Sequence, residues 1–530
     1  VRLPRLIDPL AAMTLMLTGS TAHTRKAKKL GIADLVTEER HVRAAIAAVK
    51  RGDVKGRKGG IRQRAFDLAP ARNLAAGRMR KETQAKAPQE HYPAPHALID
   101  LWAEHGGDRK AMQEAEIASF AKLLQTDTCR NLIRVFFLRG TLKDATKPGD
   151  TDGEAGDGIA AVHVIGAGVM GAEIAGWAAM QGERVTLTDP DRAALGRAVA
   201  TAREICREAH LDDLQTRDAL DRLMPDPFGY GAAKADLVIE AGPEKPELKR
   251  KIFDDLSAVM KTGAILATNT SSLQLEDFVD HVPAKARFAG LHFFNPVRKV
   301  PLVEVISHGR TDKKTRERLL AFCDAIGRLP VSLKDGPGFL VNRALMPYLL
   351  ESLLLMEEGV DKEVIDQAAT RFGMPMGPIV LADQVGLDIC LHVAASMQEA
   401  LSDRVAEIPA RLREKVEAGE TGRKAGRGFY DWSDGTPKPK SEKAPPADIE
   451  DRLFLPMLDA CAACLRNGIV GSPEEADAAM IFATGFAPFR GGPMHYAQSR
   501  GHAEVASALE RLAAQHGPRF NPDPYWREGR

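Results

Sequence analysis

The chain of 530 residues is 44% hydrophobic and 27% charged, with a formal net charge of +1 at pH 7. This composition is that of a globular protein, and the length predicts three or four domains. The near-neutral charge gives no global field for nucleic acid, and no apolar run approaches the ~20 residues of a membrane span, so neither partner is expected. No signal peptide is recognisable and six scattered cysteines favour a reducing compartment, so we expect a cytoplasmic location.

Two polar stretches divide the chain. Residues 141–158 carry four glycines and many charges, and residues 434–446 read DGTPKPKSEKAPP. Both compositions predict flexible or extended connectors. Helical patterns precede the first connector, and one helix is expected over 128–138 with Gly140 at its end.

Residues 158–331 alternate apolar strands with amphipathic helices, which predicts a parallel sheet. We expect strands at 162–165, 185–188, 237–239, 264–267 and 303–306.

The first of these strands runs into Gly166-x-Gly168-x-x-Gly171, and a helical pattern follows over 172–180. Gly166 permits a tight turn, Gly168 lets the backbone approach a pyrophosphate, and Gly171 lets helix and strand pack closely. Asp189 ends the second strand, where a carboxylate binds the adenosine ribose and repels a 2′-phosphate. A chance glycine-rich turn would lack both flanking strands and the acid, so the sequence predicts an NAD-binding site.

The rest of the chain, residues 336–432 and 447–514, is mostly helical, and its two halves repeat each other. NRALMP at 342–347, with a glycine at 359, matches DRLFLP at 451–456, with a glycine at 468. GMPMGP at 373–378 likewise resembles the segment 485–493. Such a repeat predicts two copies of one helical unit packed together.

The pair Cys461-x-x-Cys464 invites a metal-binding or redox interpretation. It lies in a stretch with helical periodicity and has no second pair nearby. A role in a helix core is therefore favoured, and no metal site is predicted.

LHFFNP at 291–296 and PLVEV at 301–305 bring a histidine and a glutamate within twelve residues. Histidine is the side chain best suited to take a proton near neutral pH, and alcohol oxidation requires such a base beside a nicotinamide. A glutamate that binds the other ring nitrogen fixes its tautomer and stabilises the imidazolium. His292 and Glu304 are therefore the candidate base and partner. A structural role for a histidine beside two phenylalanines is the alternative.

A series of ordered motifs resembles the L-3-hydroxyacyl-CoA dehydrogenase family from about residue 159 to the C-terminus. They are VIGAGVMGAEIA at 164–175, NTSSL at 269–273, HFFNP, PLVEV, GPGFLVNR at 336–343, GMPMGP, and GRKAGRGFY at 422–430. The family implies a Rossmann-type α/β NAD-binding domain followed by two repeated all-α dehydrogenase domains. It also implies oxidation of (S)-3-hydroxyacyl-CoA to 3-oxoacyl-CoA with NAD in fatty-acid β-oxidation.

The same resemblance assigns roles to individual residues. His292 is implied as the general base, paired with Glu304. Ser271 and Asn342 are implied to bind the substrate hydroxyl or thioester oxygen. The cofactor contacts that the family and the glycine motif imply are Gly166, Gly168, Met170, Gly171, Asp189, Glu244, Lys249, Ser271 and Asn295, and Asn295 is implied to touch substrate as well.

Each of these assignments has a structural alternative. Ser271 and Asn342 could cap helices, and Lys249 could lie on a solvated face.

Three other functions remain open at this point. One is a biosynthetic 3-hydroxybutyryl-CoA dehydrogenase that uses the same site. Another is a non-catalytic scaffold that docks a thiolase, against which the intact His292–Glu304 pair argues. A 3-hydroxyisobutyrate dehydrogenase type would need a catalytic lysine in place of HFFNP. The expected partners are an acyl-CoA substrate and a thiolase subunit.

The order of the chain further resembles multifunctional β-oxidation enzymes, in which a crotonase-type enoyl-CoA hydratase domain precedes the dehydrogenase. Segments 1–5, 17–19 and 27–36 resemble the end of that domain, and 92–95 its connecting region. The hydratase glutamates would precede this truncated helical remnant, and Glu38 and Glu39 cannot replace them, so no hydratase activity is expected. The expected regions are a crotonase-like tail at 1–50, a helical linker region at 51–158, the NAD-binding domain at 159–335, and helical domains at 336–433 and 447–530.

Two local features complete the interpretation. Phe482 stands where multifunctional relatives carry a tyrosine that contacts substrate, so a hydrogen bond is lost there. Residues 50–64 carry seven Lys or Arg and are interpreted as a solvated linker face. Contact with CoA phosphates is the alternative for this stretch, whereas nucleic-acid stacking lacks interleaved aromatic residues.

Overall fold

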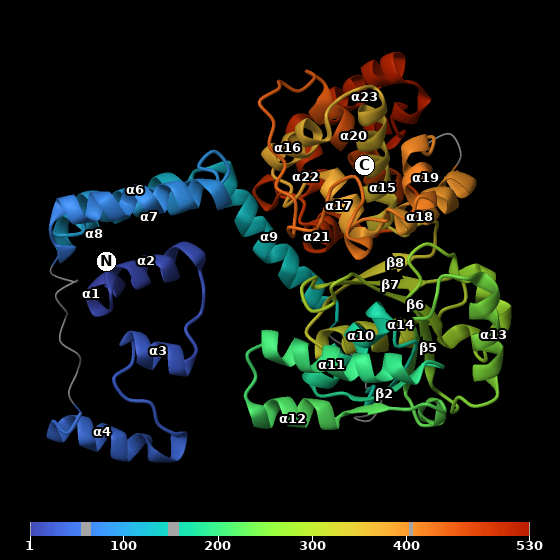
Figure 1. Ribbon diagram of the computed structural model, residues 1–530, viewed down its shortest axis with the longest axis horizontal. Helices are drawn as coiled ribbons and strands as arrows, with labels where there is room; N and C mark the ends of the chain where they lie inside the picture. Colours follow the sequence, from blue (N-terminus) through green and yellow to red (C-terminus); the bar gives the residue numbers. More distant parts are fainter. Residues whose placement is uncertain (1, 55–64, 147–157, 402–405, 529–530) are drawn as a thin grey trace. The chain divides into compact units, whose positions relative to one another are not determined.

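The computed structural model describes residues 2–54, 65–146, 158–401 and 406–528 (Figure 1). The chain forms two compact units, Val1–Ile133 and Arg134–Arg530. Parts of the expected basic stretch and of the first connector, residues 55–64 and 147–157, lie outside the described residues.

The first unit is helical among its described residues, and its main core joins several of the helices. Ile99 and Trp102 of α7 are buried together with Met112 of α8. Arg72 of α6 is also buried, and its guanidinium donates a hydrogen bond to the carbonyl oxygen of Ala103. The helices are α1 (Leu3–Leu6), α2 (Pro9–Thr18), α3 (Thr24–Leu30), η1 (Glu39–His41), α4 (Val42–Arg51), α6 (Ala69–Lys86), α7 (Pro93–His105) and α8 (Arg109–Leu124).

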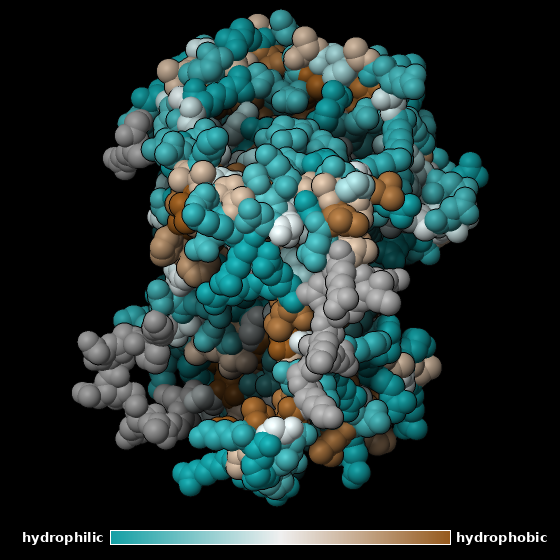
Figure 2. Space-filling view, turned by 90° about the vertical axis from the view of Figure 1, so that its left-hand side faces the viewer, coloured by the Kyte–Doolittle hydropathy of each residue, from teal (hydrophilic) through white to brown (hydrophobic). Residues whose placement is uncertain are grey.

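Several large apolar side chains of this unit remain exposed. Ile46 of α4 and Ile117 and Phe120 of α8 are each at least half exposed. Figure 2 shows brown hydrophobic side chains among the teal hydrophilic ones on the face that it draws.

The second unit contains an eight-stranded sheet. Its strand order is β3-β2-β1-β4-β5-β6-β7-β8. All five expected strands are confirmed, with shifts at their ends, whereas β3, β6 and β8 were not expected. The strands are β1 (Ala161–Ile165), β2 (Arg184–Thr188), β3 (Leu223–Pro225), β4 (Leu237–Glu240), β5 (Ile265–Thr268), β6 (Phe288–Phe293), β7 (Leu302–Ser307) and β8 (Leu329–Lys334).

The expectation of a wholly parallel sheet is wrong at one place, because β6 and β7 pair antiparallel. Residues 294–301 join these strands without a helix. A parallel crossover needs about a dozen or more residues, so the chain turns back beside the strand it has just left. This turn sets His292 directly opposite Glu304 in the ladder.

Helices cover the sheet, and their apolar faces form its cores with the buried strands (Figure 1). The expected helix after the glycine motif is confirmed as α10. The helices of this region are α10 (Val169–Gln181), α11 (Arg192–Glu208), α12 (Asp213–Asp221), η2 (Tyr230–Ala233), α13 (Pro246–Ser257), η3 (Leu275–His281), η4 (Lys285–Arg287) and α14 (Lys313–Ala325).

The helix expected to end at Gly140 continues as α9 (Asp127–Asp144). Leu138 and Leu142, one turn apart, are both buried in the core of the second unit. A Cβ at Gly140 would meet no other atom, so the glycine marks no close approach. Burial of the two leucines therefore outweighs the modest cost of a glycine inside a helix.

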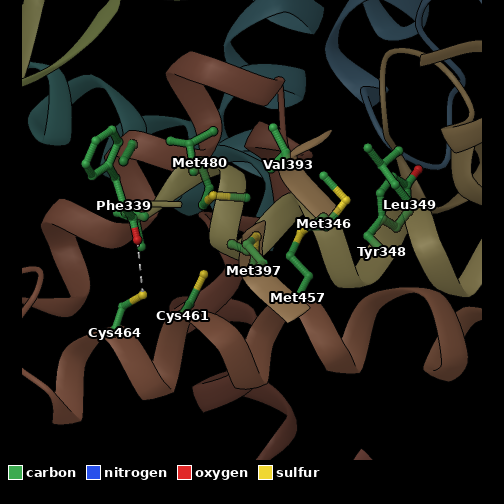
Figure 3. Close-up of a cluster of buried hydrophobic side chains, with 14 of the residues drawn as sticks. Phe339, Met346, Tyr348, Leu349, Val393, Met397, Met457, Cys461, Cys464 and Met480 are labelled. Atoms are coloured by element: carbon green, nitrogen blue, oxygen red, sulfur yellow. Dashed lines mark hydrogen bonds between the residues drawn. The ribbon is translucent and has the colours of Figure 1, made fainter. Parts of the chain in front are cut away.

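The remainder of the second unit is helical, as expected. In its core α15 and α20 pack against each other, and Figure 3 shows methionine and cysteine side chains between the helices. Cys461 and Cys464 are fully buried on α20, which confirms their helix-core placement, and Cys464 Sγ lies 3.8 Å from the carbonyl oxygen of Phe339. The helices are α15 (Val341–Glu357), α16 (Lys362–Phe372), α17 (Pro378–Val385), α18 (Leu387–Leu401), α19 (Ala410–Glu417), η6 (Arg423–Ala425), α20 (Ile449–Arg466), α21 (Pro473–Thr484), η7 (Pro488–Arg490), α22 (Pro493–Arg500), α23 (His502–His516), η8 (Pro518–Phe520) and α24 (Tyr525–Glu528).

Within the described residues, no single helix is long and apolar enough to cross a membrane. The pair Pro378–Val385 and Leu387–Leu401 reaches the required length and composition only together, and it is bent by 98°.

A buried histidine of β1 makes stability depend on pH. His163 is almost fully buried, with Nδ1 2.8 Å from Thr186 Oγ1, and burial lowers the pKa of His163 from 6.5 to about 4. Because the unfolded chain binds this proton below pH 6.5 and the folded chain only below about pH 4, acidification between these values favours unfolding. We expect urea unfolding to show that His163→Gln loses about 2 kcal/mol less stability than the parent between pH 7 and pH 5. Equal losses in the two proteins would contradict this account.

Candidate active site

His292 and Glu304 form a buried cross-strand pair at the antiparallel junction. His292 Nδ1 lies 2.7 Å from Glu304 Oε2, and Glu304 is completely buried. Opposite residues of an antiparallel ladder present their side chains on the same face. The rings of Phe294 and Phe339 lie 4.5 and 5.9 Å from the imidazole, so the histidine has an aromatic surround.

The carboxylate of Glu304 is held at the start of α15. Its Oε1 accepts hydrogen bonds from the N–H groups of Leu340 and Val341, at 3.2 and 2.9 Å. These groups have no partner inside the helix, and the positive end of the helix dipole stabilises negative charge. Because a carboxylate here accepts, His292 Nδ1 donates, and Nε2 is left as the nitrogen that can accept a proton.

The chain makes a tight approach just before this helix. Gly338 has φ +68°, and Phe339 has the positive φ of +52° that side chains rarely adopt. A Cβ at Gly338 would lie 3.1 Å from Met397 Sδ and 3.3 Å from the nitrogen of Arg343. The glycine in GPGF therefore allows the helix to begin where its N–H groups reach Glu304.

Ser271, which follows β5, and Asn342, in the first turn of α15, are in contact. The Asn342 amide donates to the carbonyl oxygen of Ser271 at 2.8 Å. The capping alternatives are wrong for both residues, since α15 has Leu340 at its N-cap, and η3 has Gln274 there with no side-chain hydrogen bond.

Glu244 organises the loop that carries Ser271. Its Oε1 accepts from the Thr270 hydroxyl at 2.6 Å and from the N–H groups of Ser271 and Ser272 at 2.8 and 3.2 Å. Burial alone would raise the pKa of Glu244, but the Lys249 charge and these hydrogen bonds together hold it below its usual value. The carboxylate is thus charged at neutral pH.

Lys249 lies inside the protein, so the solvated-face alternative is wrong. Its side chain is 1% exposed, and Nζ donates to both oxygens of Glu240, at 3.0 and 2.8 Å. Glu244 Oε2 lies 3.4 Å from the same nitrogen. Glu240 also accepts from the Thr268 hydroxyl at 2.7 Å.

Sequence reasoning missed Glu240 and Thr268. Both are the last residues of neighbouring buried strands, β4 and β5, and they are register partners. The glutamate at the end of the apolar strand Leu237–Glu240 could have indicated such a site in the sequence.

The glycine motif has the expected local geometry. Gly166 has φ +98°, and a Cβ at Gly171 would collide with the carbonyl oxygen of Gly166. A Cβ at Gly168 would meet nothing, so this side of the loop is open in front of the α10 N-terminus. Free N–H groups at a helix N-terminus bind a pyrophosphate, so these residues fit a dinucleotide. Met170 is half-buried in the first turn of α10.

Asp189 is anchored beside the same loop. One oxygen accepts from the Ala167 N–H at 2.7 Å and the other from the Asp191 N–H at 2.8 Å. The carboxylate is therefore fixed at the end of β2, where the acid of the motif is expected.

The predicted residues thus fall into two groups at the carboxyl edge of the sheet. His292, Glu304, Ser271, Asn342 and the Glu244–Lys249 pair surround the ends of β4–β7, whereas the glycine loop, Met170 and Asp189 follow β1 and β2. The groups meet where Ile165 of β1 pairs with Glu240 of β4. Asn295 lies exposed after β6.

Comparisons with known proteins agree with this geometry. The model of the 3-hydroxyacyl-CoA dehydrogenase NAD binding domain matches residues 161–336, and that of the C-terminal domain matches residues 338–432. The fatty acid oxidation complex subunit alpha of Shewanella sp. (strain MR-4) is 32% identical over 557 residues, which cover 99% of this chain and 77% of the relative.

Two solved structures are similar as well. The 3-hydroxybutyryl-CoA dehydrogenase of Escherichia coli K12 has a TM-score of 0.61 at 28% identity, covering 70% of this chain and 98% of its own. FadB2 of M. tuberculosis has a TM-score of 0.51 at 35% identity, covering 52% of this chain and all of its own.

A glycine-loop dinucleotide site beside a buried histidine–glutamate pair defines an NAD-dependent oxidoreductase. The chain belongs to the 3-hydroxyacyl-CoA dehydrogenase family, and the relatives that match 99% of it include alpha subunits of fatty acid oxidation complexes. The cofactor predicted from the glycine motif, NAD, is confirmed by this membership.

Proposed function

We propose that this chain oxidises the 3-hydroxyl of (S)-3-hydroxyacyl-CoA thioesters to a 3-oxo group in fatty-acid β-oxidation. The observation that carries the proposal is the His292–Glu304 pair, set on β6 and β7 at the same sheet edge as the glycine loop. NAD, when bound, supplies the hydride acceptor. Ligands of such sheets bind outside the carboxyl ends of the strands.

The chemistry assigned to the protein is proton removal and positioning. His292 Nε2 takes the proton of the 3-hydroxyl while the hydrogen on C3 leaves as hydride, so the C–O single bond becomes a carbonyl. The substrate loses one proton and one hydride, and the ketone that forms carries no new charge. Glu304 stabilises the imidazolium that forms. The Ser271 hydroxyl and the Asn342 amide orient the substrate oxygen, and the contact between them supports a shared role.

The remaining cofactor roles are proposals of the same kind. Gly166, Gly168 and Gly171 shape the pyrophosphate loop, with Met170 beside it, and Asp189 binds the adenosine ribose. Glu244 and Ser271 contact the nicotinamide half, and Asn295 helps to hold the nicotinamide and the substrate together. Lys249, which is buried, acts by holding Glu244.

A short-chain substrate is the second candidate, because the similar structure from Escherichia coli K12, at 28% identity, is a 3-hydroxybutyryl-CoA dehydrogenase. The relative that spans 99% of this chain, a fatty acid oxidation alpha subunit, favours the β-oxidation role.

NADH formation at 340 nm from (S)-3-hydroxyacyl-CoA of increasing chain length tests both candidates. We expect turnover that extends beyond the four-carbon substrate and that requires NAD. Activity confined to four carbons would instead assign the biosynthetic role. Absence of turnover at every length, with NADH still bound, would favour a scaffold that docks a thiolase.

We further propose that the helical part consists of two repeats, at 336–433 and 447–530, after an NAD-binding domain at 159–335. The order α15–α18 parallels α20–α23, with Pro347 and Pro456 inside the first helix of each set.

A matching pair of buried aspartates supports the repeat. Asp366 Oδ1 accepts from the Ile379 N–H at 2.8 Å, and Asp477 Oδ1 accepts from the Met494 N–H at 2.7 Å. Burial raises the pKa of Asp366 and of Asp477 to about 7. In both sets an aspartate of the second helix therefore caps the start of the third.

The N-terminal regions remain proposals. Residues 1–50 are assigned a crotonase-like origin and residues 51–158 a helical linker role, which the match to alpha subunits along 99% of this chain supports. An acyl-CoA substrate and a thiolase partner remain part of the proposal, and the relatives' description as subunits of a complex supports a partner subunit. A cytoplasmic location is supported by the six cysteines, all of which are free thiols.

A further inference from the structure

Two aromatic rings stand in solvent beside the end of β2. Phe228 is 66% exposed and Tyr230 is 74% exposed, and their rings stack with centroids 5.6 Å apart at 29°. The guanidinium carbon of Arg192 lies 5.7 Å from the Phe228 ring centroid. We call Phe228, Tyr230 and Arg192 the aromatic platform.

The loop under the platform is firmly held. The Asp226 N–H donates to the carbonyl oxygen of Leu187 at 2.8 Å, which extends the pairing of β3 with β2. The Asp226 carboxylate then accepts from the N–H groups of Phe228 and Gly231, at 3.3 and 2.6 Å. The turn that exposes the rings is therefore held in place by hydrogen bonds.

The turn lies against the residue that precedes the ribose acid. Gly229 has φ +72°, and a Cβ there would lie 3.8 Å from Thr188 Oγ1. Thr188 ends β2 and Asp189 follows it, while Arg192 begins α11 three residues later. Thus both sides of the platform, the turn after β3 and the start of α11, adjoin the site proposed for the adenosine ribose.

We propose that the aromatic platform binds the adenine ring of NAD. This inference rests on the proposed role of Asp189. The adenine is attached to the ribose that Asp189 would bind, at the end of the cofactor away from the nicotinamide. Because Asp189 follows β2, the adenine would lie on the β2–β3 side of the sheet. Aromatic rings stack on purines, and an arginine beside them adds a cation–π contribution.

Coenzyme A also carries an adenine, so the adenine bound by the platform could belong to NAD or to acyl-CoA. The position beside Asp189 and the glycine loop favours NAD. The glycine loop is proposed to bind the pyrophosphate of NAD, so the adenine next to it would be that of NAD and not that of acyl-CoA. The test measures both ligands.

The experiment compares Phe228→Ala/Tyr230→Ala with the parent. We expect the Kd for NADH, from fluorescence titration, and the inhibition constant of ADP-ribose to rise by the same factor, about tenfold or more. ADP-ribose lacks nicotinamide, so an equal loss places the effect in the adenosine half. The kcat at saturating NAD and the KM for acyl-CoA should stay unchanged, and Tyr230→Phe should bind NADH as the parent does.

A matched control uses another exposed aromatic pair. Phe136 and Phe137 of α9 are 72% and 65% exposed, with ring centroids 5.6 Å apart. Phe136→Ala/Phe137→Ala should leave the NADH Kd unchanged.

Several results would overturn the proposal. Unchanged NADH and ADP-ribose affinities would exclude the platform, and a raised KM for acyl-CoA alone would assign it to the adenine of CoA. A changed oligomeric state with normal NADH binding would make it a protein contact. If the parent itself bound no NADH, the proposed function would fail and this inference with it.

Discussion

Replacement of His292 by glutamine is expected to lower kcat for (S)-3-hydroxyacyl-CoA oxidation by about 10²–10⁴-fold, the usual contribution of a general base. The imidazole is buried, and its Nδ1 lies 2.7 Å from Glu304 Oε2. Among the described residues, no other side chain pairs with this carboxylate, so none can replace His292 as the base that it supports. Glutamine has similar reach but does not accept a proton. The NADH Kd should change little, because the glycine loop and Asp189 are separate from the pair.

The measurement is steady-state NADH formation at a fixed neutral pH, with NADH titration as a check on folding. The kcat of the variant should stay low even at saturating substrate, because the loss lies in proton transfer and not in binding. His308→Gln is the matched control, since His308 is also buried, with Nε2 3.1 Å from the carbonyl oxygen of Lys285. If His292→Gln kept a tenth or more of the parental kcat, another group would have to be the base.

Much of this site was predictable from local patterns. The glycine motif, its flanking strands and the acid at the end of β2 all lie close together in sequence, and the physical demands of a pyrophosphate loop act at that short range. Gly166 and Gly171 accordingly have the predicted geometry.

The arrangement of His292 and Glu304 was only partly predictable. Their sequence spacing suggested a pair, but the alternation of strands and helices suggested a parallel sheet. The short link between β6 and β7 determines the antiparallel pairing, and that pairing makes the two residues opposite neighbours. Loop length was therefore the neglected signal.

Lys249 was predicted as a cofactor contact, but its burial was not predicted, because its charge was considered without its position on the helix. On α13 it lies one and two turns before Phe253 and Leu256, and all three are buried. A lysine on the apolar stripe of a helix needs an acidic partner inside the protein, and Glu240 at the end of β4 is that partner.

Lys249→Met is expected to lower the free energy of unfolding by about 3–5 kcal/mol, because it leaves Glu240 buried without its cation. The Thr268 hydroxyl and the Gly242 N–H remain as donors to Glu240, but neither supplies charge. Urea unfolding at neutral pH measures the loss. Lys261→Met is the matched control: the Lys261–Asp236 pair is partly exposed, and such pairs contribute about 0–1 kcal/mol.

The double variant Glu240→Gln/Lys249→Met separates stability from function. Removing both charges should recover much of the lost stability, since the penalty of a lone buried carboxylate disappears. Lys249→Met should also weaken NADH binding, because Glu244 loses the ammonium 3.4 Å away that favours its charged form beside Ser271. The double variant should not regain this binding, since it lacks the same ammonium. Recovery of both properties would assign the pair to folding alone, whereas stability loss no larger than in Lys261→Met would contradict the buried pair itself.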